Sequence, residues 1–357
     1  MIPTDWLDAL ASVGSLTDKQ LQNRFGAEAS RWARQQEELR KKARAKFAEA
    51  DTMLFDREAL EQATHEAIAR YHASRFPLGA KVIDLTCGIG SDLHAFGPGA
   101  VGFEIDALRA EYARHNCPLT EVRTEDGLAY AQSSSDPYLW ADPDRRDSSG
   151  RRLADPSQYA PNPLDIPRDR QLTGIKLSPM LADEFLAEVG PRVEFVSFRG
   201  ECREAVVWAG KLAEAGIFAV RIETGATLGR EPTYDQVDEA GEFIFDADPA
   251  AVRAHALGGF DRPQLGDSPG YVTGGDLESE WLTPYRVLAA GTYDAKRIKE
   301  ALRNLGRRVF EVKQRGAGVE PTAIMRQVRT EGDPISLICW RVGKSVRWAL
   351  AERVGRG

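Results

Sequence analysis

The sequence of 357 residues has little cysteine, little histidine and no long apolar run. Its four cysteines lie far apart, without the spacing typical of a zinc site or of a disulfide framework. We therefore expect free thiols in a reducing compartment and no bound metal. No apolar stretch approaches the roughly 20 residues that a membrane-spanning helix needs. The cysteines are Cys87, Cys117, Cys202 and Cys339.

A secretory signal is lacking as well. The first residues, Met1-Ile2-Pro3-Thr4-Asp5-Trp6, do not follow a basic-then-apolar layout. We therefore expect a cytoplasmic protein that does not associate with membranes. Hydrophobic residues make up 42% of the chain, as is usual for a protein with a buried core. Its length predicts two or three domains.

Charge is spread unevenly along a chain whose net charge is −7. From Trp281 to the end there are sixteen Lys or Arg residues against seven Asp or Glu residues, a net charge of +9. The residues before Trp281 therefore carry a net charge of −16. Such asymmetry indicates a basic module on an acidic body, and a basic module is suited to contacting a phosphate backbone. The alternative is a solvated basic face with no ligand.

A short apolar run over 82–85 leads into a glycine turn that is typical of nucleotide-binding proteins. The run contains Asp84, the turn contains Gly88 and Gly90, and a helix follows. One strand and one helix later, Glu104 follows a second apolar run, where a carboxylate can bind both hydroxyls of a ribose. The third glycine of the dinucleotide pattern is missing, which favours a smaller nucleoside ligand. Asp92, just past the glycines, is interpreted as capping or supporting the helix start.

The chain is predicted to begin with helices over 1–77. A capping box at Thr17 to Gln20 starts them, a long helix covers 27–50, and another covers 55–76. His65 and His72 fall in the last of these, and we interpret them as surface or packing residues rather than ligands.

Strands and helices alternate from Lys81 onward, which predicts an α/β fold with a parallel sheet. Strands are predicted at 81–85, 100–105, 120–123, 137–140, 193–198 and 217–222, with a possible last antiparallel strand at 242–245. Helices are predicted at 107–116 and 202–215. Residues 147–173, rich in proline and charge, form a long irregular insertion that is typical of a functional loop.

The carboxyl-terminal part is predicted as a small α+β unit. Its strands cover 285–289, 309–313, 335–340 and 346–350, its helices start at Asp294 and Pro321, and its last hairpin turns at Gly343-Lys344. The predicted domains are therefore 1–77, 78–257 and 281–357, with a linker over 258–280.

The sequence resembles the class I S-adenosylmethionine-dependent methyltransferases. Asp84-Leu85-Thr86-Cys87-Gly88-Ile89-Gly90 is similar to the first motif of that family, and Glu104 stands at the position of its ribose-binding acid. The chain is also similar to bacterial methyltransferases with a THUMP-like carboxyl-terminal domain, related to the cap guanine-N2 methyltransferase group. The resemblance implies a Rossmann-like sheet and S-adenosylmethionine as cofactor. It implies cofactor contacts from Asp84, Thr86, Cys87, Gly88, Gly90, Glu104, Ile105, Asp126 and Gly127.

The position of the family's fourth motif is filled by Asp142-Pro143-Asp144-Arg145. In amine-methylating members an Asp/Asn-Pro-Pro-aromatic sequence accepts hydrogen bonds from the target N–H groups and stacks on a flat base. Asp142 and Pro143 match that pattern, and the resemblance makes them the catalytic candidates. Asp144 and Arg145 depart from it, although the guanidinium of Arg145 can stack on a base. The alternative is that Asp142-Pro143 only ends a strand and starts a turn.

Lys176 and Arg315 are the remaining candidates for substrate binding. Lys176 follows the insertion, where the chain should return to the pocket, and it is equally well read as a surface lysine. Arg315 stands beside Gly316 and Gly318, and glycines next to cations let a backbone approach a phosphate. A basic turn without a ligand is the alternative.

These observations predict an S-adenosylmethionine-dependent methyltransferase that modifies a nitrogen in RNA. RNA is chosen because of the basic tail and the family resemblance, and no base-reading motif is found. One alternative is a methyltransferase acting on a protein or a small molecule. Another is a cofactor-binding, RNA-associated protein that has lost catalysis, because the fourth motif is altered.

Overall fold

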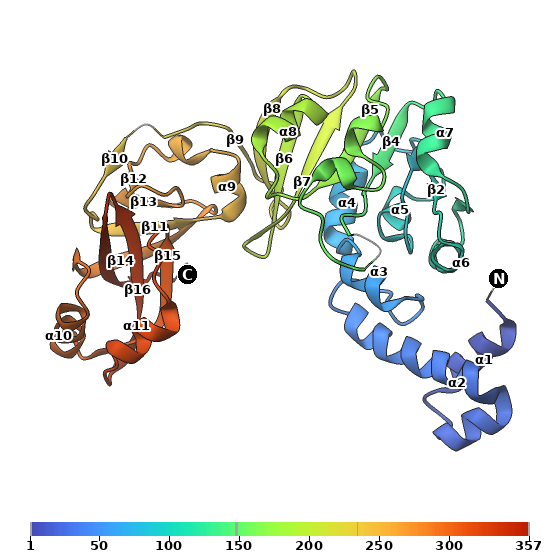
Figure 1. Cartoon of the computed structure of the whole chain (residues 1–357), viewed down its shortest axis with the longest axis horizontal. Helices are drawn as coiled ribbons and strands as arrows, with labels where there is room; N and C mark the ends of the chain where they lie inside the picture. The colour runs from blue at the N-terminus through green and yellow to red at the C-terminus, as the bar shows by residue number, and fades with distance from the viewer. Residues whose placement is uncertain (1, 147–148, 234, 356–357) are drawn as a thin grey trace. The chain divides into compact units, whose positions relative to one another are not determined.

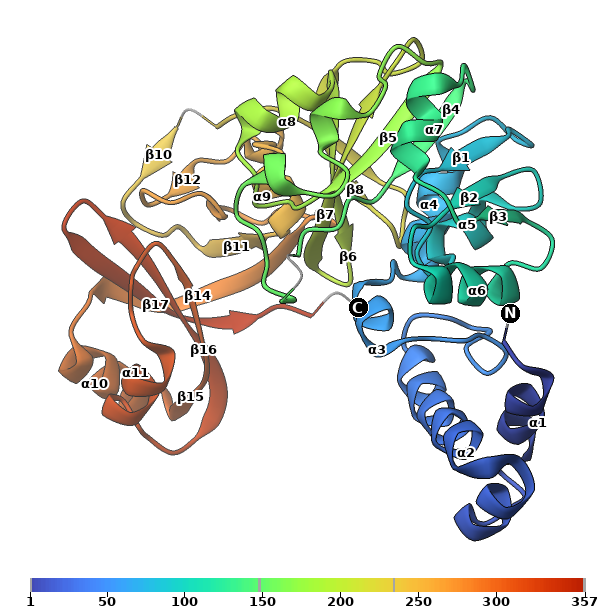
Figure 2. The same cartoon turned by 45° about the vertical axis from the view of Figure 1, so that its right-hand side comes forward.

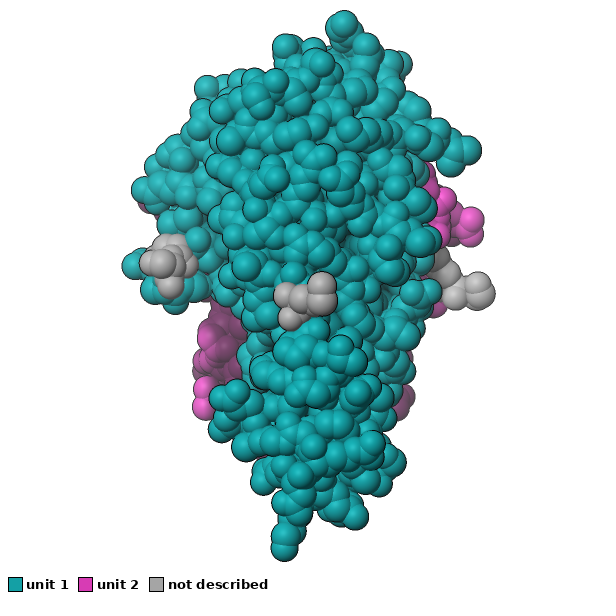
Figure 3. Space-filling view, turned by 90° about the vertical axis from the view of Figure 1, so that its right-hand side faces the viewer, with its two compact units in different colours: residues 1–193, 206–215 teal, residues 194–205, 216–357 magenta. Residues whose placement is uncertain are grey.

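The computed structural model describes residues 2–146, 149–233 and 235–355. The chain separates into two compact units (Figure 3). The first comprises residues 1–193 and 206–215, and the second comprises residues 194–205 and 216–357. Within the described residues, no helix is both long enough and apolar enough to cross a bilayer.

The amino-terminal part of the first unit is helical, as predicted (Figure 1). Thr17 and Gln20 form the predicted capping box, in which Gln20 N donates to Thr17 Oγ1 and Thr17 N donates to Gln20 Oε1. The helix that follows bends at Gly26, whose φ is +85°, and ends at Ala43, earlier than predicted. The four helices are α1 (Thr4–Ser12), α2 (Asp18–Ala43), α3 (Arg57–Gln62) and α4 (Glu66–Ser74).

The single helix predicted over 55–76 is wrong, because local caps divide it in two. Ala63 leaves the helical conformation with a ψ of 133°. His65 then caps α4, its Nδ1 accepting a hydrogen bond of 3.1 Å from Ala67 N. The break places Thr64, between α3 and α4, on the wall of the cavity described below.

The central sheet has the predicted α/β alternation. Its hydrogen-bonded order is β3-β2-β1-β4-β5-β7-β6-β8-β9, and β3, β2, β1, β4 and β5 run parallel (Figures 1 and 2). Asp84 is in register with Gly102 and with Trp140, so β1, β2 and β4 end at one edge of the sheet. The strands are β1 (Val82–Asp84), β2 (Val101–Phe103), β3 (Glu121–Arg123), β4 (Tyr138–Ala141), β5 (Leu172–Leu177), β6 (Arg192–Phe198), β7 (Glu201–Ala209), β8 (Gly216–Arg221) and β9 (Thr227–Gly229).

Short helices link the parallel strands. They are α5 (Ser91–Phe96), α6 (Ala107–Asn116), α7 (Gly127–Ser133) and α8 (Asp183–Val189). The predicted irregular insertion contains two 3₁₀ turns, η1 (Pro156–Gln158) and η2 (Pro163–Asp165), and β5 begins at its end. Residues 147–148 of that insertion lie outside the described part of the chain.

Packing against β4 and β5 requires glycine at position 174. A Cβ atom there would lie 2.5 Å from Trp208 and 2.7 Å from Trp140, both of which are fully buried. The His72 ring lies 4.3 Å from the Trp140 ring, between centroids. Aromatic packing therefore fixes α4 against the strand that carries the predicted fourth motif.

The helix predicted over 202–215 is wrong, because this segment contains β7. Arg199 and Gly200 have φ values of 55° and 76°, and the two positive values form the tight turn that joins β6 to β7. The run Ala205–Ala209 is buried throughout, which suits a central strand better than a helix with one wet face. The segment predicted as a last antiparallel strand, 242–245, instead begins β11 of the second sheet.

The second unit carries an eight-stranded sheet of order β10-β12-β13-β11-β14-β17-β16-β15. The strands and helices predicted beyond residue 281 are confirmed, as is the hairpin turn at Gly343-Lys344. The helices α10 and α11 pack on β15 around a core that includes Ile298, Leu302 and Ile324. The elements are β10 (Gln236–Val237), β11 (Phe243–Ala247), α9 (Pro249–Arg253), η3 (Leu257–Phe260), β12 (Gln264–Leu265), β13 (Tyr271–Gly274), β14 (Leu282–Thr292), α10 (Ala295–Leu305), β15 (Arg307–Arg315), α11 (Pro321–Gln327), β16 (Asp333–Val342) and β17 (Ser345–Arg353).

The segment predicted as a linker, 258–280, contributes to this sheet. Its strands β12 and β13 pair with each other, and β13 also pairs with β11. Because β11 pairs in turn with β14, one sheet contains strands that precede and strands that follow this segment in the sequence. The predicted domain boundaries themselves stay predictions.

Candidate functional site

A cavity of about 920 Å³ in the first unit opens where β1, β2 and β4 end. Its size and its mixed polar and apolar walls are typical of a small-molecule site. Asp84 and Gly90 flank the wall without lining it, whereas the other candidates in this unit lie on it. Those residues are Thr86, Cys87, Gly88, Glu104, Ile105, Asp126, Gly127, Asp142, Pro143, Arg145 and Lys176.

The turn after β1 forms one wall of the cavity. Gly88 and Gly90 have φ values of +55° and +91°, which residues other than glycine rarely adopt. A Cβ atom at Gly90 would also lie 2.7 Å from Cys117 Sγ. Asp84 is buried behind the turn, where its carboxylate accepts a hydrogen bond from Thr86 N at 3.1 Å, and burial raises the pKa of Asp84 well above its ordinary value.

Glu104 follows β2 on the neighbouring wall. Its Oε1 accepts a hydrogen bond of 2.8 Å from Asp106 N, which fixes the carboxylate over the cavity. Burial raises the pKa of Glu104. The next residue, Ile105, is 75% exposed, although it is a large apolar side chain on the cavity wall. An exposed isoleucine beside an oriented carboxylate is suited to a ligand with an apolar face and hydroxyl groups.

Asp126 and Gly127 stand at the start of α7. Asp126 caps this helix, and its Oδ1 accepts hydrogen bonds from Leu128 N (2.9 Å) and Ala129 N (3.2 Å). Gly127 lies so near β1 that a Cβ atom would stand 2.2 Å from Leu85 O. The close approach requires glycine at this position.

Asp142 follows β4 and lines the cavity as well. Its backbone N donates a hydrogen bond of 2.8 Å to Thr86 Oγ1, which ties the fourth-motif segment to the turn after β1. Its Oδ2 lies 2.5 Å from Lys176 Nζ, and Pro143 beside it is buried. Burial raises the pKa of Asp142 despite the attraction of Lys176.

Three arginines line the cavity together with Asp142. They are Arg145, Arg146 and Arg152, and all three contribute to its wall. Arg146 donates to Gly150 O at 3.0 Å. The guanidinium of Arg145 makes no ion pair or hydrogen bond with any residue that the structure describes. The cavity wall therefore offers positive charge to a ligand.

Comparison with known proteins relates most of the chain to methyltransferases. A crystal structure from Porphyromonas gingivalis, of a protein with a provisional methyltransferase assignment, matches 98% of both chains with a TM-score of 0.80 at 17% identity. The THUMP domain-like family matches residues 282–353. Two proteins from strains of Mycobacterium tuberculosis, named uncharacterized S-adenosylmethionine-dependent methyltransferases, are each 33% identical over 346 residues, 90% of this chain and 95% of theirs. The chain belongs to the S-adenosylmethionine-dependent methyltransferases.

S-adenosylmethionine is therefore the cofactor, and the cavity of this methyltransferase fits it. The glycine turn leaves room for a ligand where a side chain would project, and the Glu104 carboxylate is held in position to accept hydroxyl hydrogen bonds. The buried Nε2 of Gln62, on the same wall, has no hydrogen-bond partner among the described residues. The predicted role of each cofactor-binding residue stays a prediction.

The sequence analysis missed a chain of polar residues behind Asp142. Lys176 Nζ donates to Thr64 Oγ1 at 2.9 Å as well as to Asp142, and Thr64 Oγ1 donates to Asp92 Oδ2 at 2.8 Å. His72 Nδ1 lies 2.7 Å from Asp92 Oδ1. Asp92, interpreted as capping or supporting the helix start, instead bonds to Thr64 and His72, and the cap position of α5 is Gly90. His72, interpreted as a surface or packing residue, also belongs to this chain. The one available signal was the position of Asp92 beside the glycine turn.

Arg315, the third predicted substrate-binding residue, belongs to the second unit. Its Nη2 lies 3.0 Å from Asp246 Oδ1, and Lys313 Nζ lies 2.9 Å from the other oxygen of Asp246. A Cβ atom at Gly270 would lie 2.6 Å from Arg315 Nε, so the side chain packs closely against the backbone there. A structural role is thus visible for Arg315, and its predicted substrate contact stays a prediction.

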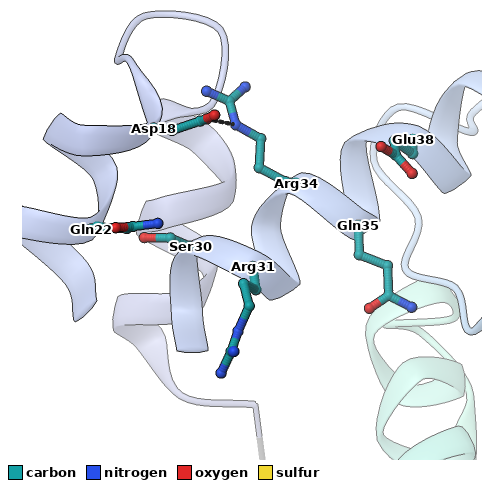
Figure 4. Close-up of a pocket in the computed structure, with 7 residues that line it drawn as sticks. All are labelled: Asp18, Gln22, Ser30, Arg31, Arg34, Gln35 and Glu38. Atoms are coloured by element: carbon teal, nitrogen blue, oxygen red, sulfur yellow. Dashed lines mark hydrogen bonds and ion pairs between the residues drawn. The ribbon is translucent and has the colours of Figure 1, made fainter. Parts of the chain in front are cut away.

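A smaller cavity of about 300 Å³ lies beside the bend of α2. Figure 4 shows that its side chains come from that helix, with Arg34 directed toward Asp18 at 2.7 Å. Arg34 also donates to Val13 O and Leu16 O, so it ties α2 to the segment before it. We therefore interpret this cavity as a consequence of helix packing. Within residues 2–146, 149–233 and 235–355, no cluster of His, Cys, Asp or Glu is arranged to hold a metal ion.

Proposed function

We propose that this methyltransferase methylates a nitrogen atom of a base in RNA. The observation that carries the proposal is that Asp142-Pro143 lines the same cavity as the glycine turn and Glu104. The proposed donor site and the acceptor groups therefore share one cavity. An in-line methyl transfer requires that arrangement, because its rate depends on how donor and acceptor are aligned.

The acceptor side fits a nitrogen that carries hydrogen atoms. Lys176 binds Oδ2 of Asp142, which leaves Oδ1 to accept a hydrogen bond from a target N–H. The side chain of Asp142 is 29% exposed, so the cavity gives access to it. When bound, S-adenosylmethionine supplies an electrophilic methyl group. The carboxylate of Asp142 directs the nitrogen lone pair toward that group and receives the proton that the methylated nitrogen releases.

The choice of RNA as the substrate rests on two sets of positively charged residues. The guanidinium of Arg145, which has no partner among the described residues, can stack on a base or bind a nearby phosphate, as can those of Arg146 and Arg152. The residues from Trp281 onward carry the net charge of +9, and they overlap the THUMP domain-like match at 282–353. We infer that this basic part holds the phosphate backbone while the first unit modifies the base. The reaction takes place in the cytoplasm.

Mass spectrometry of nucleosides tests the proposal. RNA from cells that lack the protein should miss one methylated base, which returns with the wild-type gene and not with Asp142→Ala. Purified protein should then methylate RNA from the deficient cells. Methylation of a protein or small-molecule fraction, with none in RNA, would contradict the proposed substrate. Cofactor binding without transfer to any fraction would instead support the alternative of a cofactor-binding protein that has lost catalysis.

A further inference from the structure

An unbroken hydrogen-bonded chain joins Asp142 to the amino-terminal helices. Lys176, on β5, donates to Asp142 and to Thr64, and Thr64 donates to Asp92 on α5. Asp92 also bonds to His72 on α4. Each link is 2.9 Å or shorter, so the chain has little freedom to rearrange.

Most of the chain is buried, although Thr64, Asp92 and Lys176 line the cavity together with Asp142. The side chain of His72 is fully buried, that of Asp92 is 7% exposed and that of Lys176 is 8% exposed. A buried ammonium group needs opposite charge and hydrogen bonds around it. The ammonium group of Lys176 donates to the carboxylate of Asp142 and to the hydroxyl of Thr64. That hydroxyl donates in turn to the carboxylate of Asp92.

We propose that Lys176 is a positioning residue for Asp142, and that Thr64, Asp92 and His72 anchor Lys176 from the amino-terminal helices. This inference rests on the proposed function, because it assigns Asp142 to the acceptor. Lys176 holds Oδ2 and leaves Oδ1 for the acceptor, and its charge favours the ionised carboxylate. The helices over 57–74 therefore complete the methyl-transfer site, although the strands that define the fold begin only at Val82.

The charges around Asp142 determine what removal of Lys176 should do. Lys176 on β5 and Arg145 after β4 favour the ionised carboxylate, whereas Asp92 on α5 and Asp84 on β1 disfavour it. Burial already raises the pKa of Asp142 with Lys176 present. Without Lys176 the carboxylate should hold its proton to still higher pH.

The test compares Lys176→Met and Thr64→Val with wild type. Methyl transfer to RNA from the deficient cells is measured against pH. Because the ionised carboxylate is the active form, Lys176→Met should move the acid limb of kcat to higher pH by about one unit or more and lower kcat at neutral pH at least about tenfold. Thr64→Val should cause a smaller change in the same direction, and Thr64→Ser should restore wild-type behaviour.

A matched control is the ion pair of Lys81 with Asp136, 3.2 Å apart in the same unit and outside the cavity. Lys81→Met should leave the pH profile unchanged. Affinity for S-adenosylhomocysteine should stay near wild type in all the variants, because the proposed role concerns the acceptor side. An equal loss of cofactor affinity and activity would indicate general disruption of the fold and overturn the proposal.

A second measurement needs no acceptor. Carbon-13 NMR of aspartate carboxyl groups, with Asp142→Asn to assign the signal, follows the titration of Asp142 in protein saturated with S-adenosylhomocysteine. The midpoint should move to higher pH in Lys176→Met and in Thr64→Val. An unchanged midpoint in both would overturn the positioning role. Absence of methyl transfer by the wild type would contradict the proposed function alone, since the titration still decides the role of Lys176.

Discussion

Replacement of Glu104 by alanine should weaken the binding of S-adenosylmethionine. Glu104 follows β2 at the edge where the cavity opens, and its carboxylate is oriented by Asp106 N at 2.8 Å. A carboxylate so held can accept hydrogen bonds from both hydroxyls of a ribose. Alanine removes both acceptors and leaves the hydroxyls without a protein partner.

The magnitude follows from two properties of the Glu104 site. Hydrogen bonds to a charged group contribute about 1.5–3 kcal/mol each. One effect reduces the sum, because Oε1 already accepts a hydrogen bond from Asp106 N. We therefore expect a net loss of about 1.5–3 kcal/mol, which is roughly a tenfold to a hundredfold increase in Kd.

Isothermal calorimetry with S-adenosylmethionine and S-adenosylhomocysteine measures this loss directly. Glu104→Gln keeps the side-chain shape and should fall between the wild type and Glu104→Ala. Glu121→Ala is the control, because Glu121 pairs with Arg123 on β3, is 55% exposed and does not line the cavity. Wild-type affinity in Glu104→Ala would refute the assignment of this wall to the ribose.

Three further predictions concern chemistry, packing and RNA. Asp142→Ala should lower kcat at least about a hundredfold, or about 2.7 kcal/mol of barrier, with little change in the affinity for S-adenosylmethionine measured by calorimetry. Gly127→Ala should destabilise the protein by about 1–3 kcal/mol in urea unfolding, because its Cβ would stand 2.2 Å from a main-chain oxygen, whereas Gly14→Ala, with no atom within 4 Å, should not. Lys296→Glu with Arg297→Glu, both exposed on α10, should weaken RNA binding and flatten its dependence on salt, with cofactor affinity as the control.

The strand ends that line the cavity could be predicted from the sequence because their signals are local. An apolar run followed by glycines fixes where β1 ends, and a second run followed by Glu104 fixes where β2 ends. Parallel strands in register then bring the two ends together without further information. The same reasoning located Asp142, which follows β4.

Other parts could not be predicted, because tertiary context overrides local pattern. The segment 202–215 contains residues with acceptable helix propensity, and only the buried position of β7 within the sheet decides its conformation. The Arg199-Gly200 pair was a readable hairpin signal, but a tight turn needs strands on both sides to be recognised. The short strands β12 and β13 carry too few residues to show a period.

The polar chain behind Asp142 shows a different limit of sequence reasoning. Thr64 and Lys176 are 112 positions apart, and neither has a neighbour in sequence that indicates a partner. Their contact exists because a break between α3 and α4 exposes the hydroxyl of Thr64 to β5, while the rings of His72 and Trp140 pack together behind it. This packing thus places the hydroxyl of Thr64 beside the ammonium group of Lys176, which in turn contacts the carboxylate of Asp142. Charge and shape at the acceptor side are consequently set by helices that the sequence assigns to a separate amino-terminal domain.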